Sequence, residues 1–546
     1  MAKPNDDYEY HLYEELRAGR LSRRQFLQRA SIAGVALPTV SAILAACGSS
    51  SGSGPATSGA GGAPRHGGTL RIGVTGVGTS IDPVTAYTPG QLTILQLPGE
   101  YLCQPRDNLT LAPVLATSWS ADASAKTWTF KLRQGVKFQD GSPMTTADVV
   151  ATFERLVNPK SQSAALSAFQ GILSSGQIEG SGNSVIFHLD RPFADFPFLT
   201  TNYNYNTIIL PASYKENTFT KGKIGTGPMI LTQYVPGQSA AYVRNPHYWA
   251  PGKPYLDKIA VTLYGDAAPM VLALQNSTID YVTAFDYQDA KPLLSDSSLT
   301  IHSGRATSYR ALAMRVDKAP FSDKRVRQAM ALTLSRPALV KGLLGGHGEL
   351  GNDHGFPPVL KTTPTASELP QRVQDLTKAK HLLAAAGHSS GLNVTLTTEN
   401  YLEIPSYVTI VKSEAAKVGI NINLDIMTAT AYYGSGNNQP WLQVPFGCTE
   451  WATRPDAGQN IEPLFLSKGV WNEGHYKNPV LDRLMIAYDG ELDLTKRKKL
   501  ALQAATIMHD DVPVIISYWI DTLTPASSTV HGVNVNATNA SGMWLA

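Results

Sequence analysis

The chain has 546 residues, which is more than one hydrophobic core normally serves, so we expect two or three domains. Only 16% of the residues are charged, the formal net charge is +3, and the sequence has no basic stripe of the kind that nucleic-acid-binding proteins carry. This balance implies no polyelectrolyte partner. The many Gly, Pro and Tyr residues (46, 35 and 23) are typical of a loop-rich α/β protein that works outside the cytoplasm.

The first 46 residues are predicted to be a targeting segment rather than part of the fold. Residues 22–27 contain the pair Arg23 and Arg24 and resemble a twin-arginine (Tat) export signal. The apolar run over about residues 30–46 is marginal for a spanning helix, which needs about 20 apolar residues. We therefore expect a Tat-type signal peptide over residues 1–46. The alternative is an uncleaved N-terminal anchor.

The signal ends in Leu-Ala-Ala-Cys47, which resembles the lipobox of bacterial lipoproteins, so we expect Cys47 to carry a lipid. Residues 47–65 are rich in Gly, Ser and Ala and are predicted to be a flexible tether. The G-x-S-x-G match at residues 48–52 lacks the flanking strand and helix of a nucleophile elbow and carries no weight. Cys103 and Cys448 then remain, either as a disulfide or as two buried thiols.

Apolar residues alternate in four segments of the first half of the chain, and each segment is predicted to be a strand. The four sets are Leu70, Ile72, Val74; Trp128, Phe130, Leu132; Val185, Phe187, Leu189; and Ile259, Val261, Leu263. A helix is expected to begin near Thr145, whose hydroxyl can cap it while Asp148 stands three residues on.

The second half of the chain alternates helices and strands. Helices are predicted from about Ser322, after Arg336-Pro337, and over residues 375–387, 406–419 and 493–511; strands are predicted over residues 392–400, 422–427 and 512–520. Gly387 and Gly419 stand where two of these helices should end. The order strand, helix, strand predicts a βαβ unit with a parallel sheet.

Several phrases along the chain resemble the extracellular solute-binding proteins of family 5, the peptide, nickel and opine receptors of ABC importers. They include GGTLRIG (67–73), the stretch 111–156, GTGPM (225–229), FSDKRVRQAMALTLSR (321–336) and EWATRPDAGQNIEPLF (450–465). These phrases occur in the family's order over nearly the whole chain after residue 66. No single phrase is specific, but their common order makes the resemblance strong.

The resemblance implies an α/β, two-lobed type II periplasmic-binding-protein fold with an additional β-rich domain and hinge crossovers between the lobes. Lobe I would comprise residues 66–305 and 521–546, with the additional domain near 100–220. Lobe II would comprise residues 306–520. The ligand would lie between the lobes, which close on it about a hinge.

The resemblance also directs attention to a loop in lobe II. Tyr432 and Trp451 are expected to form walls of the ligand cleft, with lobe core as the alternative for both. Arg454 could bind a carboxylate with its planar guanidinium. Asp456 could bind a ligand ammonium or cap the next turn, as peptide-binding members place an aspartate in this loop. The two charges could also pair with each other.

Lobe I is expected to contribute three further ligand-binding residues. Thr79 and Ser80 lie in a Gly-rich loop that resembles the segment contacting peptide backbones in the family, with an ordinary turn as the alternative. Phe285 is expected at the cleft near the hinge. Gly227 in the GTGPM phrase is interpreted as a backbone requirement, not as a ligand contact.

We expect no catalytic residues, no cofactor and no metal site. The run from His347 to His354, with Glu349 and Asp353, matches no compact metal motif, and a nickel or haem receptor remains a minor alternative. A secreted hydrolase that uses Asp456 or Asp82 is the other alternative, although no second carboxylate is nominated by the sequence.

The expected function is that of an extracytoplasmic receptor of an ABC importer. It would capture a short peptide or a similar zwitterionic or carboxylated small molecule and deliver it to the permease subunits. The protein is expected to be a monomer on the outer face of the bacterial cell membrane, held there by its N-terminal lipid. No nucleic-acid partner is expected.

Overall fold

The computed structural model of the chain describes residues 63–76, 81–106, 108–283, 285, 287–435, 438–535 and 540–546. The predictions for Arg23, Arg24, Cys47, Thr79 and Ser80 lie outside these residues. Within the described ranges, we find no helix whose length and apolar character would let it span a membrane.

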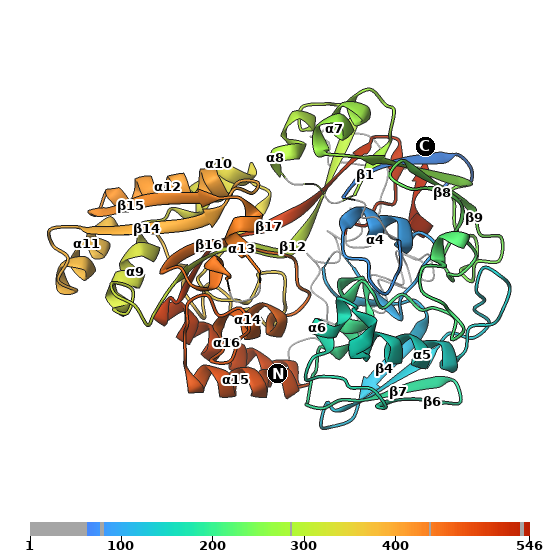
Figure 1. The fold of residues 1–546 in the computed structure, drawn as a ribbon, viewed down its shortest axis with the longest axis horizontal. Coiled ribbons are helices and arrows are strands. Elements are labelled where there is room, and N and C mark those ends of the chain that lie inside the picture. The colour runs from blue at the N-terminus through green and yellow to red at the C-terminus, as the bar shows by residue number, and fades with distance from the viewer. Residues whose placement is uncertain are drawn as a thin grey trace, which may run out of the picture. The chain divides into compact units, whose positions relative to one another are not determined.

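One mixed sheet of eleven strands runs through the described part of the chain (Figure 1). The strand order is β15-β14-β16-β12-β17-β11-β1-β10-β9-β8, and β13 pairs with β17 beside this path. The strands are β1 (Thr69–Thr75), β8 (Met229–Val235), β9 (Ser239–Arg244), β10 (Lys258–Tyr264), β11 (Tyr281–Val282), β12 (Leu299–Met314), β13 (Gly348–Leu350), β14 (Leu392–Glu399), β15 (Ile420–Met427), β16 (Phe446–Trp451) and β17 (Val514–Ser527). The strands predicted around residues 70–74 and 259–263 are confirmed as β1 and β10, which pair in parallel.

Two long antiparallel strands, β12 and β17, link the two lobes. They pair from Leu299 opposite Ser527 to Ala313 opposite Val514, with register shifts between Gly304 and Ser308 and between Tyr309 and Ala311. The far half of β17 pairs with β11, and the far half of β12 pairs with β16. Because each strand continues from one lobe into the other, both serve as the hinge crossovers that the family resemblance implied.

We call the elements before β12, together with β18 (Val530–His531) and β19 (Trp544–Leu545), lobe I; we call α9 to α16 with β13 to β16 lobe II. Buried apolar side chains form one large cluster made of residues from 70 to 281 and 526 to 543. Two others, within residues 309–520, contain only side chains of lobe II and the hinge strands. The residue boundaries predicted for the lobes stay a prediction.

Lobe I contains a separate four-stranded antiparallel sheet, which is the additional β-rich domain. Its order is β4-β5-β7-β6, with β4 (Ala116–Ala121), β5 (Thr127–Leu132), β6 (Ile178–Ser181) and β7 (Ser184–His188). Helix α5 (Thr146–Val157) has Thr145 as its N-cap, as predicted, and the Thr145 backbone N–H donates to Asp148 Oδ2 (2.7 Å). Phe130, Phe153 and Phe187 meet edge to face beneath this helix, so the sheet and the helix share one aromatic core.

The remaining elements of lobe I are short. They are α4 (Pro89–Gln96), α6 (Ala165–Phe169), α7 (Ala267–Gln275), α8 (Tyr287–Ala290), β2 (Cys103–Pro105), β3 (Leu111–Pro113) and the 3₁₀ turns η1 (Pro159–Ser161), η2 (Phe196–Thr200), η3 (Asn202–Asn204), η4 (Phe219–Lys221), η5 (Lys291–Leu293) and η7 (Ala540–Gly542). Gly225 and Gly227 lie against the backbone of Pro98, and a Cβ on either would come within 3 Å of it. The predicted backbone requirement at Gly227 is therefore confirmed.

Lobe II contains the predicted βαβ unit, because β14 and β15 pair in parallel and α12 (Ile404–Ala416) connects them. Helices α11 (Leu376–Ala385) and α12 end before Gly387 and Gly419, each at φ +88°. The other helices are α9 (Lys324–Leu332), α10 (Arg336–Leu344), α13 (Ala429–Tyr433), α14 (Ala457–Phe465), α15 (Pro479–Gly490) and α16 (Leu494–Asp511), with the turn η6 (Pro440–Leu442).

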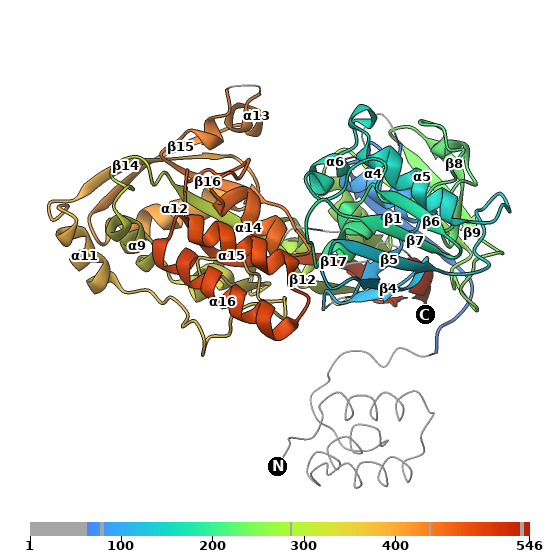
Figure 2. The same cartoon turned by 90° about the horizontal axis from the view of Figure 1, so that it is seen from below.

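Side chains alternate between the two faces of the hinge strands, so each face packs against a different core of lobe II. Leu312 and Ile515 face the side covered by α9 to α12, whereas Ala313 and Ile516 face the side covered by α14 to α16. Figure 2 shows α14, α15 and α16 side by side on that second face. The central strands are thus buried on both faces, as the apolar run over residues 512–520 predicted.

Candidate functional site

The end of β16 and the loop from it to α14 carry three of the predicted site residues, Trp451, Arg454 and Asp456. β16 is an inner strand, antiparallel to β12 and parallel to β14 over Thr397 and Thr398. The loop follows the carboxyl end of β16, next to the carboxyl end of β14. In open α/β sheets, this is the edge at which ligands bind.

Trp451 is held in a fixed orientation. Its indole N–H donates to Glu473 Oε1 (3.1 Å), and only 3% of the residue is exposed. The ring stacks on Tyr309 (centroids 5.8 Å apart, 13° between planes) and meets Trp471 edge to face. These contacts make Trp451 a rigid part of the floor beneath the loop.

Arg454 lies over the faces of two tryptophans. Its guanidinium carbon is 5.7 Å from the ring centre of Trp451 and 5.3 Å from that of Trp471. The Arg454 backbone N–H donates to Thr307 Oγ1 (2.7 Å), and the Thr307 hydroxyl donates back to the Arg454 carbonyl. This exchange ties the loop to the hinge strand β12.

The Arg454 guanidinium has no carboxylate partner within the described part of the chain. It takes part in no ion pair there, and its Nε–H has no acceptor. Burial lowers the pKa of Arg454, while the negative charges of Asp456 and Glu450 oppose that shift. Burial raises the pKa of Tyr205 of lobe I, and the nearby charge of Arg454 opposes that shift, so the guanidinium lies near the opposite lobe.

Asp456 is the N-cap of α14 and is buried. Its Oδ1 accepts the backbone N–H of Gln459 (2.9 Å), whereas its Oδ2 has no hydrogen-bond partner among the described residues. Burial and the nearby negative charge of Asp195 raise the pKa of Asp456 to about 8. The two charges of the loop therefore have different surroundings, and no ion pair joins Asp456 to Arg454.

Tyr432 and Phe285 are both buried. The Tyr432 hydroxyl is 2.9 Å from Thr449 Oγ1, which in turn donates to Glu473 Oε2 (2.6 Å). Phe285 forms a β-bridge with Leu523 and packs in the small core near α7 and the hinge. Neither side chain forms a free wall in this structure.

Several charged side chains that the sequence reasoning did not nominate lie near this loop. Arg310 of β12 pairs with Glu403 (Nε to Oε1, 2.8 Å), and both are almost fully buried. Glu399, at the end of β14, accepts the hydroxyl of Tyr433 (2.6 Å). Burial raises the pKa of Glu450, which stands opposite Arg310 across the sheet. Arg310 stands at an inward position of the apolar strand YRALAM. A charge at such a position is the sequence signal from which these residues could have been predicted.

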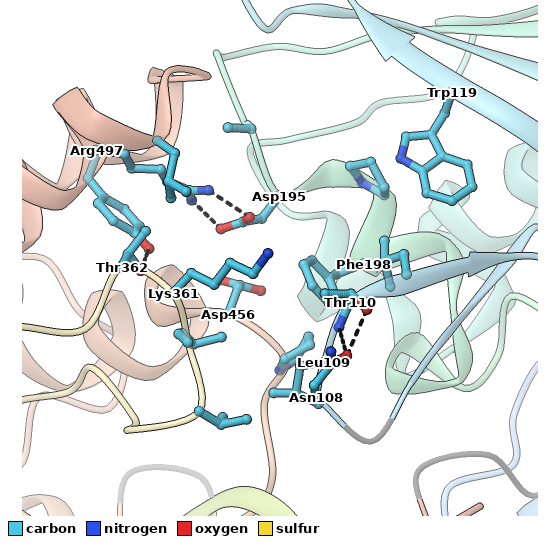
Figure 3. A pocket seen from close by; sticks show the side chains of 18 of the residues that line it. Asn108, Leu109, Thr110, Trp119, Asp195, Phe198, Lys361, Thr362, Asp456 and Arg497 are labelled. Atoms are coloured by element: carbon cyan, nitrogen blue, oxygen red, sulfur yellow. Dashed lines mark hydrogen bonds and ion pairs between the residues drawn. The ribbon is translucent and has the colours of Figure 1, made fainter. Parts of the chain in front are cut away.

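A cavity of about 390 Å³ lies beside Asp456, between elements of the two lobes (Figure 3). Its walls include Leu109, Leu111, Trp119, Trp128, Pro197 and Phe198 from lobe I and Leu360, Lys361, Thr362, Pro455, Tyr488 and Leu494 from lobe II. Figure 3 shows Lys361 extending toward its middle and the Asp195–Arg497 pair at one side. The walls of the cavity are mostly apolar, and its charged lining residues are Asp195, Lys361, Asp456 and Arg497.

The histidine-rich run does not assemble into a cation site. Glu349 pairs with Arg305 (3.1 Å), and Asp353 is buried between Arg336 and Arg372. Burial lowers the pKa of His354 to about 4. Among the described residues, no group of three or more His, Cys, Asp or Glu side chains could hold a metal ion.

The two cysteines of the described chain are free and buried. Cys103 donates to the carbonyl of Pro197 (3.4 Å), and burial raises the pKa of its thiol to about 12. Burial also raises the pKa of Cys448 in β16. The sequence left open whether these cysteines form a disulfide or remain two buried thiols, and the structure contains two buried thiols.

Two α/β lobes joined by two shared strands, with an aromatic and charged loop at the carboxyl edge of the sheet, define the class of two-lobed binding proteins. The chain belongs to the bacterial extracellular solute-binding proteins, family 5, whose middle region matches residues 110–472. The family to which the sequence motifs pointed is thereby confirmed.

Known relatives cover most of the chain. The glutathione-binding protein GsiB of Escherichia coli K12 is 25% identical over 447 residues, which are 80% of this chain and 84% of GsiB. HbpA2 of Haemophilus parasuis superposes with a TM-score of 0.77 at 21% identity, covering 88% of this chain and all of HbpA2. DppA of Helicobacter pylori, in complex with the peptide STSA, has a TM-score of 0.68 at 22% identity, covering 88% and 98%. These structures are type II periplasmic binding proteins, which confirms the predicted fold.

Proposed function

We propose that this protein is an extracytoplasmic receptor of an ABC importer that captures a short peptide, or a similar small molecule with a carboxylate, between its lobes. Membership of family 5 supports the receptor role. The proteins similar to it include one named for glutathione and others determined with a tetrapeptide, a nonapeptide and a nickel–histidine complex. Because the ligands of these proteins differ, we infer the ligand of this chain from its own residues.

The guanidinium of Arg454 is the observation that supports a ligand with a carboxylate. It is held over two indole rings, lies near Tyr205 of lobe I, and has no carboxylate partner in the described chain. A largely desolvated cation without a partner is costly, and a ligand carboxylate would offset that cost with two parallel hydrogen bonds. We assign Arg454 as the carboxylate-binding residue and Trp451 as the platform beneath it.

The other predicted site residues are assigned to supporting roles in this proposal. Thr79 and Ser80 would supply polar contacts from lobe I. Asp456 would orient the loop by capping α14, which Oδ1 already does. Tyr432 and Phe285 would stiffen the two sides of the site from within the core.

We also propose that the protein is tethered to the membrane and has no catalytic activity. The twin-arginine segment and Cys47 would export the chain and anchor it by lipid on the outer face of the cell membrane, where one copy would act with the permease subunits. Asp82, a carboxylate considered for hydrolysis, is buried and accepts the Val84 backbone N–H (2.8 Å) and the Tyr214 hydroxyl (2.7 Å), so it is engaged as a structural acceptor. We expect no turnover of peptides by the purified protein.

Isothermal titration of the exported protein with tri-alanine tests the proposal. One equivalent should bind, and Arg454→Ala should raise Kd at least tenfold, or about 1.4 kcal/mol, because a desolvated charge pair is lost. Arg133→Ala is the matched control, since Arg133 also lies over an indole, that of Trp249 at 4.0 Å, but in lobe I. Equal affinities for the parent and Arg454→Ala would remove Arg454 from the site.

A further inference from the structure

Ion pairs join the two lobes where the loop after β7 of lobe I meets helices α14, α15 and α16 of lobe II. Arg191, in the loop between β7 and η2 of lobe I, donates to Asp489 Oδ2 of α15 (2.5 Å) and to both oxygens of Glu462 of α14 (3.1 and 3.2 Å). Arg497 of α16 donates in the opposite direction, to Asp195 Oδ1 of the same lobe I loop (2.9 Å) and to its Oδ2. Each lobe thus contributes one guanidinium, which pairs with carboxylate groups of the other lobe.

The same loop also makes backbone and packing contacts with lobe II. The Ala194 backbone N–H donates to the carbonyl of Asp489 (2.6 Å). A Cβ placed on Gly490 would lie 2.9 Å from Pro192, so the two segments of the chain pass very close to each other here. The Arg497 guanidinium lies 4.1 Å from the ring centre of Tyr488. The contact is a fitted interface rather than an accidental meeting of long side chains.

Three of the charged side chains at this contact are well removed from water, whereas those of Arg191 and Glu462 are 30% and 31% exposed. The Asp489 side chain is fully buried, and those of Arg497 and Asp195 are 11% and 12% exposed. Ion pairs with this little exposure are screened weakly and are ordered by their hydrogen bonds, unlike exposed pairs. Opening the lobes about β12 and β17 would separate these partners.

The contact contains two guanidiniums and four carboxyl groups. The fourth carboxyl group is that of Asp456, which lies beside Asp195 and Asp489. Burial, followed by a hydrogen bond with Asp489, raises the pKa of Glu462 to about 9, and the pKa of Asp456 is about 8.

We propose that Arg191, Arg497 and Asp195 form a latch between the lobes that stabilises the closed form and thereby sets the affinity for the ligand. This inference rests on the proposed function for its affinity component. A receptor that must close on its ligand binds more tightly as the closed form becomes more populated. We assign the three side chains as positioning residues that act through the position of the lobes, and Asp195 and Arg497 also line the cavity between the lobes. Release of the ligand should be the step that they slow.

The first test measures the separation of the lobes without any ligand. Labels on Ser120→Cys in lobe I and Lys498→Cys in lobe II, both exposed positions, report the distance by pulsed electron spin resonance. Arg497→Gln and Arg191→Gln should each shift the distance distribution toward longer values. Arg315→Gln is the control, because the Arg315 side chain is also largely buried (6% exposed) but pairs with Asp317 within lobe II. Its distribution should equal that of the parent.

The second test exchanges the charges of one pair. Asp195→Asn and Arg497→Gln should each raise the Kd for tri-alanine about tenfold through faster release. The double variant Asp195→Arg with Arg497→Asp restores an ion pair and should recover most of the affinity and the short distance. If both single variants leave distance and affinity unchanged, the latch does not exist. If the double variant has the parent's melting temperature but the distances of the single variants, the role is not electrostatic. Absence of tri-alanine binding to the parent would contradict the proposed ligand class alone, because the ligand-free distances still decide the latch.

Discussion

Glu473 offers the clearest prediction of pH-dependent stability in this protein. Its carboxyl group is buried under the site, where Oε1 accepts the indole N–H of Trp451 (3.1 Å) and Oε2 accepts the hydroxyl of Thr449 (2.6 Å). Burial raises its pKa to about 8 in the folded protein, from an ordinary value of 4.5. The folded state therefore binds a proton that the unfolded state has already released at neutral pH.

The sign of the effect follows from this difference. Where the folded state holds more protons than the unfolded state, stability falls as the pH rises, so Glu473 weakens the protein progressively from about pH 4.5 to about pH 8. Each pH unit inside this window costs at most roughly 1.4 kcal/mol. Between pH 5 and pH 7, the loss from this one group is roughly 2–3 kcal/mol.

Glu473→Gln removes the titration and keeps the shape. The amide oxygen can accept the indole N–H while the amide N–H₂ faces Thr449, as a protonated carboxyl group would. Urea unfolding of the parent and the variant at pH 5, 6, 7 and 8 should show the variant gaining about 2–3 kcal/mol relative to the parent between pH 5 and pH 7. Other buried carboxyl groups titrate equally in both proteins, so the difference isolates Glu473. A parent–variant difference that stays constant over this range would refute the reasoning.

Three further predictions concern the buried salt bridge, the backbone and the tether. Asp353→Asn should lower stability by about 3 kcal/mol, seen as a lower melting temperature, because two buried guanidiniums lose their anion. Gly225→Ala should cost more than about 2 kcal/mol, because its Cβ would meet the Pro98 carbonyl oxygen at 1.7 Å, whereas Gly265→Ala has open space around its Cβ and should be tolerated. Cys47→Ala should move the protein from the membrane fraction to the culture medium or periplasm in a blot of fractionated cells, and an unchanged distribution would contradict lipid anchoring.

Much of the fold could be predicted because its signals are local. The period-two pattern of Trp128, Phe130 and Leu132 placed β5, and the Thr145–Asp148 pair placed the start of α5. The βαβ unit followed from a strand, a helix that ends near Gly419, and another strand. The long shared strands β12 and β17 were less accessible, since their pairing joins residues more than 200 positions apart along the chain.

The candidate site was predicted less completely, because burial and pairing are properties of the folded chain. The sequence singled out Trp451, Arg454 and Asp456, and the fold brings them together in one loop. It did not show that Asp456 caps α14 or that Glu473, a further 17 positions along, holds the Trp451 indole. The latch arginines escaped notice as well, because Arg191 and Arg497 look like ordinary surface charges until the two lobes are placed together.

The central claim is that the protein captures one carboxylate-bearing solute between its lobes through Arg454. Native mass spectrometry of the exported protein, purified without added ligand and then titrated with tri-alanine, measures this directly. We predict one bound solute per chain in the parent, whether co-purified or added, and its loss in Arg454→Ala at the same protein concentration while Arg133→Ala retains it. A parent that binds no such solute, or one that binds it equally well without the Arg454 guanidinium, would contradict the claim.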